Sequence, residues 1–154
     1  MTPKTGTLTK VYLSDKEYPS EADLDLVMYT EEIPSPEEAA EAVTYQTTDM
    51  ASEEQSKGPK KASTMDIPIL YTRSQHKSLK ERADSNETCW VFIRLPESTC
   101  KDTTEKPLVK SFSAQLDLVG NTITVSDMIK DTLRLYRNSP VKETYGLPVA
   151  PTGE

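Results

Sequence analysis

The stretch from Lys106 to Pro140, "KPLVKSFSAQLDLVGNTITVSDMIKDTLRLYRNSP", holds the most regular pattern in the chain. Apolar and polar residues alternate from Pro107 to Leu118, which predicts a strand with one face against a core. Gly120-Asn121 follows and marks a turn. Beyond the turn the apolar spacing changes from two residues to three or four. The stretch therefore predicts a strand, a turn and a helix.

The predicted helix has a clear beginning and end. Thr124-Val125-Ser126-Asp127 matches a capping box, in which the threonine oxygen accepts an amide hydrogen bond and the aspartate reaches back. Asn138 and Pro140 are suitable stop residues. Between Thr124 and Asn138, the residues that recur at helical spacing form one apolar stripe: Val125, Met128, Ile129, Thr132, Leu133 and Tyr136. This stripe predicts a helix packed against the preceding strand.

Other segments give weaker predictions. Thr88–Leu95 is rich in β-forming residues and predicts a strand, and a short strand is expected around Glu143–Leu147. Met65–Thr72 is an apolar island interrupted by Pro68, which fits an edge strand or a short docking motif. Two further islands, Thr7–Leu13 and Leu24–Tyr29, could pair as a hairpin. The polar segment between Arg73 and Glu87 fits either a solvated helix or a linker.

Composition and charge suggest three regions. Hydrophobic residues make up only 35% of the 154-residue chain and aromatic residues 6%, which is low for one continuous core. Residues 1–56 carry a net charge of −10, residues 57–82 of +5 and residues 83–154 of −2. We therefore expect an acidic, mostly disordered arm (1–64), a basic connector with an apolar island (65–87) and a folded α+β module (88–154).

The same features bear on location and partners. No apolar run is long enough to cross a membrane, and the first ten residues lack a hydrophobic signal region. These observations predict a cytoplasmic protein, in which Cys89 and Cys100 are free thiols. An acidic chain is repelled by phosphate, so no specific nucleic-acid partner is expected.

The residue inventory gives little support for catalysis. His76 is the only histidine and lies in a polar, basic stretch. A Cys89–His76 nucleophilic pair can be written, but a cysteine in a strand is better explained as facing a core. One histidine and two cysteines do not make a tetrahedral metal site, and no phosphate-binding glycine loop is present. We expect a protein that is not an enzyme and holds no metal or cofactor.

Two segments resemble a known family. "VFIRLPE" (Val91–Glu97) is similar to the first strand of ubiquitin-like domains, and "TITVSDMIKDTLRLYRNSP" (Thr122–Pro140) is similar to their helix entry. Together they resemble Ras-association domains and the ubiquitin-like middle domain of the substrate-binding subunit of TOR complex 2. The resemblance covers about Cys89–Pro140 and implies a β-grasp fold. Such domains continue with two or three more strands. Either N-terminal strands complete the sheet, or the chain is a fragment, or the fold is another one.

The resemblance also implies a function. It suggests an adaptor or scaffold in signal transduction, whose module binds a small GTPase or a kinase substrate through a strand edge and a helix face. Ras-association domains use basic residues for this contact, and the matching partner-binding positions here are Lys110, Lys130, Arg134 and Arg137. The acidic arm would dock to a second, basic partner.

Five serines lie in sequences that protein kinases recognise. Acidic residues follow Ser14, Ser20 and Ser52, proline follows Ser35, and two lysines precede Ser63 by a short interval. These serines are phosphorylation candidates.

An alternative function requires no signalling partner. The chain would be an extended structural subunit of a large assembly, with segments that fold on binding and wrap their neighbours. The apolar islands Thr7–Leu13, Leu24–Tyr29 and Met65–Thr72 would then serve as anchors, since a flexible spacer would not need them.

Overall fold

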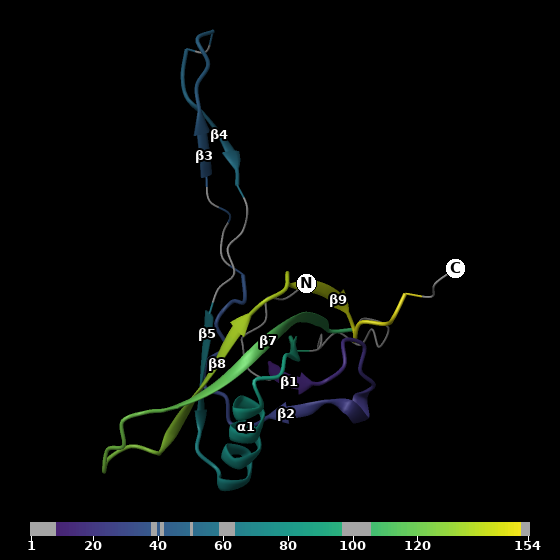
Figure 1. The fold of residues 1–154 in the computed structure, drawn as a ribbon, viewed down its shortest axis with the longest axis vertical. Coiled ribbons are helices and arrows are strands. Elements are labelled where there is room, and N and C mark those ends of the chain that lie inside the picture. The colour runs from purple at the N-terminus through teal and green to yellow at the C-terminus, as the bar shows by residue number, and fades with distance from the viewer. Residues whose placement is uncertain are drawn as a thin grey trace.

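The computed structural model describes residues 9–37, 40, 42–49, 51–58, 64–96 and 106–151. Within these residues the chain is mostly strand, with one α-helix (Figure 1). In chain order the elements are β1 (Lys10–Ser14), the 3-10 helix η1 (Glu21–Asp23), β2 (Asp25–Val27), β3 (Ala42–Tyr45), β4 (Glu54–Lys57), β5 (Thr64–Leu70), α1 (Arg73–Ser85), β6 (Cys89–Arg94), β7 (Leu108–Gly120), β8 (Lys130–Arg137) and β9 (Lys142–Tyr145).

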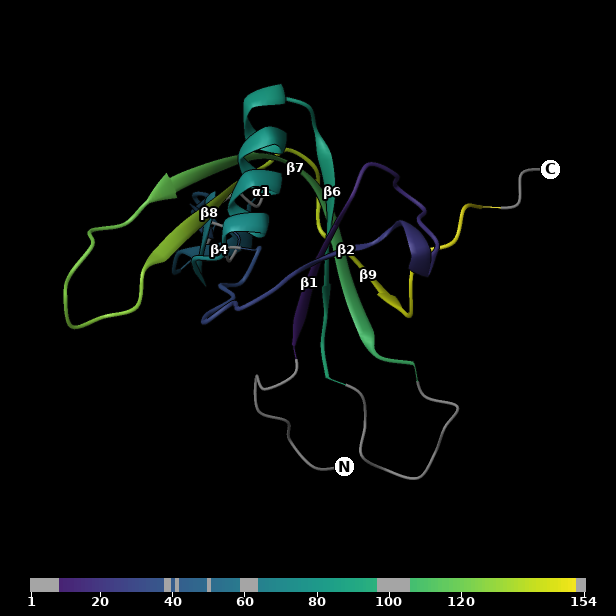
Figure 2. The ribbon, with the colours of Figure 1, turned by 90° about the horizontal axis from the view of Figure 1, so that it is seen from below.

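The main sheet is antiparallel and has the strand order β2-β1-β6-β7-β8-β5. The long strand β7 pairs with β8 through Ala114–Gly120 and with β9 through Leu108–Ser111. The segment after β2 returns to the other end of the sheet, where Thr30 bridges Ile69 of β5. The sheet is therefore curled, as Figure 2 shows from below.

The core fills the inside of this curl. Alternate residues of β1, β5, β6, β7 and β8 meet there, and Leu79 of α1 joins the same cluster. The alternation in β7 that the sequence predicts is confirmed, because Phe112, Ala114, Leu116 and Leu118 are all buried in the cluster. Cys89 also faces the core, as expected, and burial raises the pKa of its thiol to about 11.

The predicted helix between Thr124 and Arg137 is wrong. Residues 121–129 form a loop, and Lys130–Arg137 forms β8, paired with β7 on one side and β5 on the other. Leu133 and Leu135 are fully buried, whereas Val125 and Met128 of the proposed stripe are exposed. The segment satisfies a two-residue period as well as a helical one, and pairing on both edges stabilises the strand.

The β-grasp prediction is also wrong, and so is the disordered arm. A β-grasp needs a helix after its second strand, but α1 lies before β6 and strand β8 stands where that helix was expected. β1 and β2, from the predicted arm, form the expected hairpin, and β1 pairs with β6 inside the sheet. Val11 and Leu13 of β1 are buried in the core. The apolar residues upstream of residue 64 thus complete the sheet.

Two side chains of helix α1, Gln75 and Arg82, contact the strand β2 region, and Arg82 does so through an ion pair with Asp25. Gln75 is buried, and its amide nitrogen donates to the Met28 carbonyl at 2.9 Å while its amide oxygen accepts from the Met28 N–H at 2.8 Å. The helix ends at Ser85, and its C-cap, Asn86, adopts the left-handed conformation (φ 55°) that asparagine tolerates. Gln75 thereby satisfies both the backbone N–H and the backbone carbonyl of Met28.

We expect Gln75→Ala to lower the free energy of unfolding by about 1–3 kcal/mol, because two backbone groups of Met28 lose their partners. Urea unfolding followed by circular dichroism measures this. The matched control is Lys77→Ala, an exposed position on the same helix, where we expect a change within about 0.5 kcal/mol. Equal effects of the two substitutions would show that the Gln75 contact contributes nothing.

Candidate interaction surfaces

The four basic residues predicted to bind a partner do not form one patch. Lys130 and Arg134 share one face of β8, whereas Arg137 lies on the other and Lys110 belongs to β7. Each contacts a group within the chain. The contacts are Lys110 Nζ with Glu143 Oε1 at 3.7 Å, Lys130 Nζ with Glu31 Oε2 at 3.2 Å, Arg134 Nε with Asp66 Oδ1 at 2.8 Å, and Arg137 Nη1 with the Ser139 carbonyl oxygen at 2.8 Å.

The Arg134–Asp66 contact joins β8 to β5 through two parallel hydrogen bonds, the second from Nη2 to Oδ2 at 3.3 Å. Hydrogen bonding to Arg134 lowers the pKa of Asp66 below its ordinary value of 3.8. Because the folded-state pKa is depressed, this contact stabilises the fold above the unfolded pKa, and the contribution is lost as the pH falls through the folded value.

We expect Arg134→Gln to raise the pKa of Asp66 toward 3.8, since the charged hydrogen-bond donor is gone. An NMR titration of the Asp66 side-chain carboxyl carbon between pH 2 and pH 6 measures both values. Lys130→Gln, on the same strand but paired with Glu31, is the control and should leave the Asp66 titration unchanged. The contact is disproved if Arg134→Gln leaves the titration where it was.

The phosphorylation candidates lie in different surroundings. Ser20 and Ser35 are exposed, and their hydroxyls donate to Asp23 Oδ2 at 3.0 Å and to the Glu37 carbonyl at 3.1 Å. Ser52 is exposed in the segment before β4. Ser14 is buried in β1, where its hydroxyl accepts from the Lys16 N–H at 3.1 Å. Ser63 lies outside the described residues. Modification of Ser14 would require β1 to leave the sheet.

The only histidine contacts a buried acid. His76 Nδ1 lies 2.9 Å from Asp131 Oδ2, and the Asp131 side chain is almost fully buried. The rings of His76 and Tyr71 are 5.3 Å apart between centroids. Cys89 lies in the core cluster, so its thiol is shielded. Within the described ranges, no three His, Cys, Asp or Glu side chains are grouped as a metal ion would require.

Strands β3 and β4 form a hairpin that projects from the curled sheet (Figure 1). Every residue of both strands is exposed, including Val43 and Tyr45. The pair is held by its own ladder and by the Tyr45 hydroxyl, which donates to Glu54 Oε2 at 2.8 Å. The sequence pattern does not predict this hairpin, because its strands are short and lie in a polar segment.

The loop of residues 121–129 is the second projecting feature. Ile123, Val125, Met128 and Ile129 are all exposed in it, and Val125 is fully so. These are apolar residues that the helix prediction placed partly against the core. Gly120-Asn121, which marks the turn, was the signal for the true boundary.

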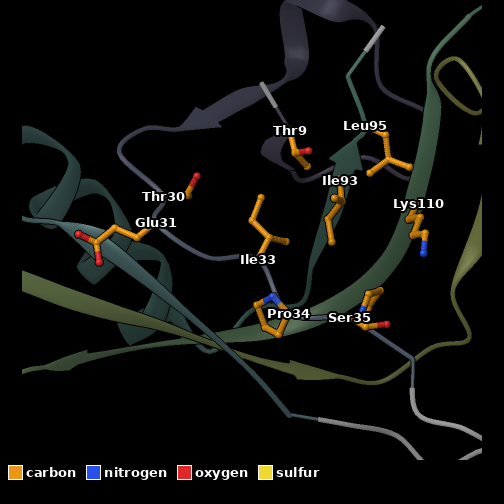
Figure 3. A pocket seen from close by; sticks show the side chains of 10 residues that line it. Thr9, Thr30, Glu31, Ile33, Pro34, Ser35, Ile93, Leu95 and Lys110 are labelled. Atoms are coloured by element: carbon orange, nitrogen blue, oxygen red, sulfur yellow. The ribbon is translucent and has the colours of Figure 1, made fainter. Parts of the chain in front are cut away.

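A pocket of about 690 Å³ lies beside β6 and the segment after β2. Figure 3 shows Ile33 and Pro34 on one side of it and Ile93 and Leu95 on another, with Lys110 at the side of β7. Thr30 and Glu31 line the end nearest β5. Half of the ten lining residues are apolar, and the two charged ones, Glu31 and Lys110, contact Lys130 and Glu143 respectively.

Comparisons with known proteins identify the fold but not a family. No protein-family model and no curated protein matches the sequence. A chain in the cryo-EM structure of the anti-feeding prophage baseplate, 6-fold symmetrised, superimposes with a TM-score of 0.63 at 10% identity. The match covers 94% of this chain and 97% of that chain. At this identity the likeness establishes a shared fold.

The likeness corrects the functional expectation. The prediction of a signalling adaptor that binds a small GTPase or a kinase complex rested on a β-grasp, and the chain instead shares its fold with a baseplate chain. The Ras-association and TOR complex 2 resemblance is therefore wrong. Within the described residues, no helix has the length and apolar character needed to span a membrane.

Proposed function

We propose that this chain is a non-catalytic structural subunit of a large protein assembly, and that the β3–β4 hairpin is an arm that binds a neighbouring subunit. The observation that carries the proposal is the exposure of the hairpin. Strands β3 and β4 bury none of their residues against the rest of the chain. This is the alternative function drawn from the sequence, an extended structural subunit of a large assembly. The sequence pointed to the apolar islands as anchors, whereas here the anchor is the β3–β4 hairpin.

Physical chemistry supports the arm. An isolated two-stranded hairpin is at best marginally stable in water, because its two strands bury too little apolar surface to offset the lost chain entropy. A partner that covers Val43 and Tyr45 would supply the missing burial, at about 25 cal/mol per Å². The hairpin also has two free edges, which allow strand addition by a neighbour.

The shared fold supports the same proposal. The anti-feeding prophage chain is part of a baseplate, and the likeness extends over nearly the whole of both chains. A structural subunit needs protein partners on several faces, and this chain projects two features, the hairpin and the loop of residues 121–129, in addition to its curled sheet (Figure 1).

The test replaces residues 42–57 with a short Gly-Ser linker in a tagged chain expressed in the cells that encode it. We expect the tagged full chain to sediment with large particles in a density gradient, and the variant to sediment as free protein. The melting temperature of the purified variant should be unchanged within about 2 °C, because every residue of strands β3 and β4 is exposed.

A matched variant separates the arm from general damage. Tyr145→Asp changes an exposed side chain on β9, away from the hairpin, and should leave the particles intact. The proposal fails if the full chain is found only as free protein, or if the chain without the hairpin enters the particles as well as the full chain does.

A further inference from the structure

The loop of residues 121–129 presents an apolar surface at one end of β7. Ile123 is 71% exposed, Met128 is 69% exposed, and Val125 between them is fully exposed. Isolated apolar residues on a surface are ordinary, but four exposed ones on a nine-residue loop, Ile129 included, are typical of an interaction site. Asp127 is the only charged residue of the loop.

The loop is anchored at its base. The Thr132 hydroxyl donates to Asn121 Oδ1 at 2.7 Å, and the Tyr71 N–H donates to the Ile129 carbonyl at 2.8 Å. These contacts fix where β7 ends and β8 begins. The apolar side chains are therefore held out from the sheet on a defined stem, which lowers the entropy lost on binding.

The pocket described above offers a matching surface. Its wall beside β6 and β7 consists of Ile93, Leu95 and the stem of Lys110, and Ile33 and Pro34 face them (Figure 3). Both charged side chains of the lining contact partners of the same chain. An apolar insert could therefore enter the pocket without separating either charged side chain from its partner.

The loop cannot fill this wall of its own pocket. Lys110 and Gly120 are ten residues apart on one continuous strand, a distance of about 33 Å. A nine-residue loop that must return to β8 reaches only about half its contour, roughly 15 Å. The insert and the receiving wall therefore lie at opposite ends of β7, too far apart to meet within one molecule.

We propose that the loop of residues 121–129 docks into the pocket lined by Ile33, Ile93 and Leu95 of a second copy of this chain. The contact joins two different surfaces, so it is head-to-tail and propagates into a ring or a filament. It identifies one partner of the proposed structural subunit and rests on that proposed function. A second copy is the occupant we favour because one chain carries both the apolar loop and the receiving wall, which it cannot bring together within one molecule, and because the chain that shares this fold belongs to a 6-fold symmetrised baseplate.

The first test is a disulfide between copies. In a Cys100→Ser background, a chain with Val125→Cys is mixed with a chain with Leu95→Cys that differs in mass, and both are oxidised. Cys89 is buried and should not react. We expect the mixed disulfide to dominate over disulfides between identical chains. The control mixes Leu95→Cys with Val149→Cys, a valine outside the loop that is 83% exposed, and should give little mixed product.

The second test is self-association of the purified full chain by sedimentation velocity. We expect association that weakens about tenfold or more in Val125→Asp, because a charge is placed where an apolar side chain should be buried. The melting temperature should not change, since Val125 contacts no core residue in the free chain. Val149→Asp should associate as the unchanged chain does.

Several outcomes would overturn the inference. A chain that stays monomeric at all concentrations, association that Val125→Asp leaves unchanged, or equal cross-linking from Val125→Cys and Val149→Cys would each do so. The two proposals fail separately. Loss of large particles on removal of the hairpin, with Val125→Asp silent, supports the proposed function alone. The reverse result supports the loop contact and contradicts the role of the hairpin.

Discussion

We expect Leu133→Asp to unfold the chain at 25 °C. Leu133 is fully buried in β8, with Leu118 of β7 opposite it on one side and Ile67 of β5 on the other. An unpaired carboxylate there lacks any compensating donor and costs several kcal/mol, in addition to the lost apolar burial. That sum approaches the 5–15 kcal/mol, roughly, by which domains are stable. Circular dichroism and urea titration measure the loss.

The informative control is the same substitution eight residues earlier. Val125→Asp changes a fully exposed side chain in the loop, so the free energy of unfolding should change by less than about 0.5 kcal/mol. A helix with the apolar stripe predicted from the sequence would bury both residues and suffer from both changes. Comparable destabilisation by the two substitutions would therefore contradict strand β8 and restore the helix.

The strands could be predicted wherever the pattern had a single period. In β7, apolar residues alternate with polar ones from Phe112 to Leu118 without a break, so the two-residue period is complete there. The edge-strand interpretation of Met65–Thr72 is confirmed by β5, which lies at the end of the sheet order. Its Pro68 is tolerated because one edge of the strand has few partners. In both cases the local residue pattern is sufficient to predict the strand.

The segment from Thr124 to Arg137 shows where local chemistry is insufficient. Its apolar residues fit a helix, yet Asp131, Leu133 and Leu135 also alternate and are the residues that become buried. The choice depends on β5, whose residue Ile67 pairs with Leu133 from far upstream in the chain. A capping box stabilises a helix end by only about 1 kcal/mol, less than two ladders of strand pairing with core burial.

The interaction surfaces could not be predicted from the sequence, for a related reason. The sequence alone does not show whether a basic residue has an acidic partner within the fold. Arg134 contacts Asp66, which lies 68 positions away in the chain. Exposure of Val125 and Met128 likewise depends on which strands fill the sheet. The acidic residues of the predicted arm, such as Glu31, turn out to contact the basic residues of the C-terminal half.

The second large effect is expected from Phe112→Ala. Phe112 is fully buried in the middle of β7, opposite Val91 of β6, and belongs to the cluster that fills the curl. Truncation removes the ring and leaves a cavity, so we expect the free energy of unfolding to fall by about 3–5 kcal/mol. Urea unfolding of the purified chain measures it, and Phe112→Leu should recover more than half of the loss.

The matched control for this aromatic deletion is Tyr145→Ala on β9. Tyr145 is 78% exposed, so truncating its ring to alanine should lower the free energy of unfolding only slightly. A loss at Phe112 no larger than the loss at Tyr145 would mean that the curled sheet does not close around this residue. The hairpin and the loop of residues 121–129 are both attached to this sheet. Phe112→Ala should therefore weaken every assembly contact at temperatures where Phe112→Leu still assembles. Val125→Asp, in contrast, should weaken only the contact made by the loop.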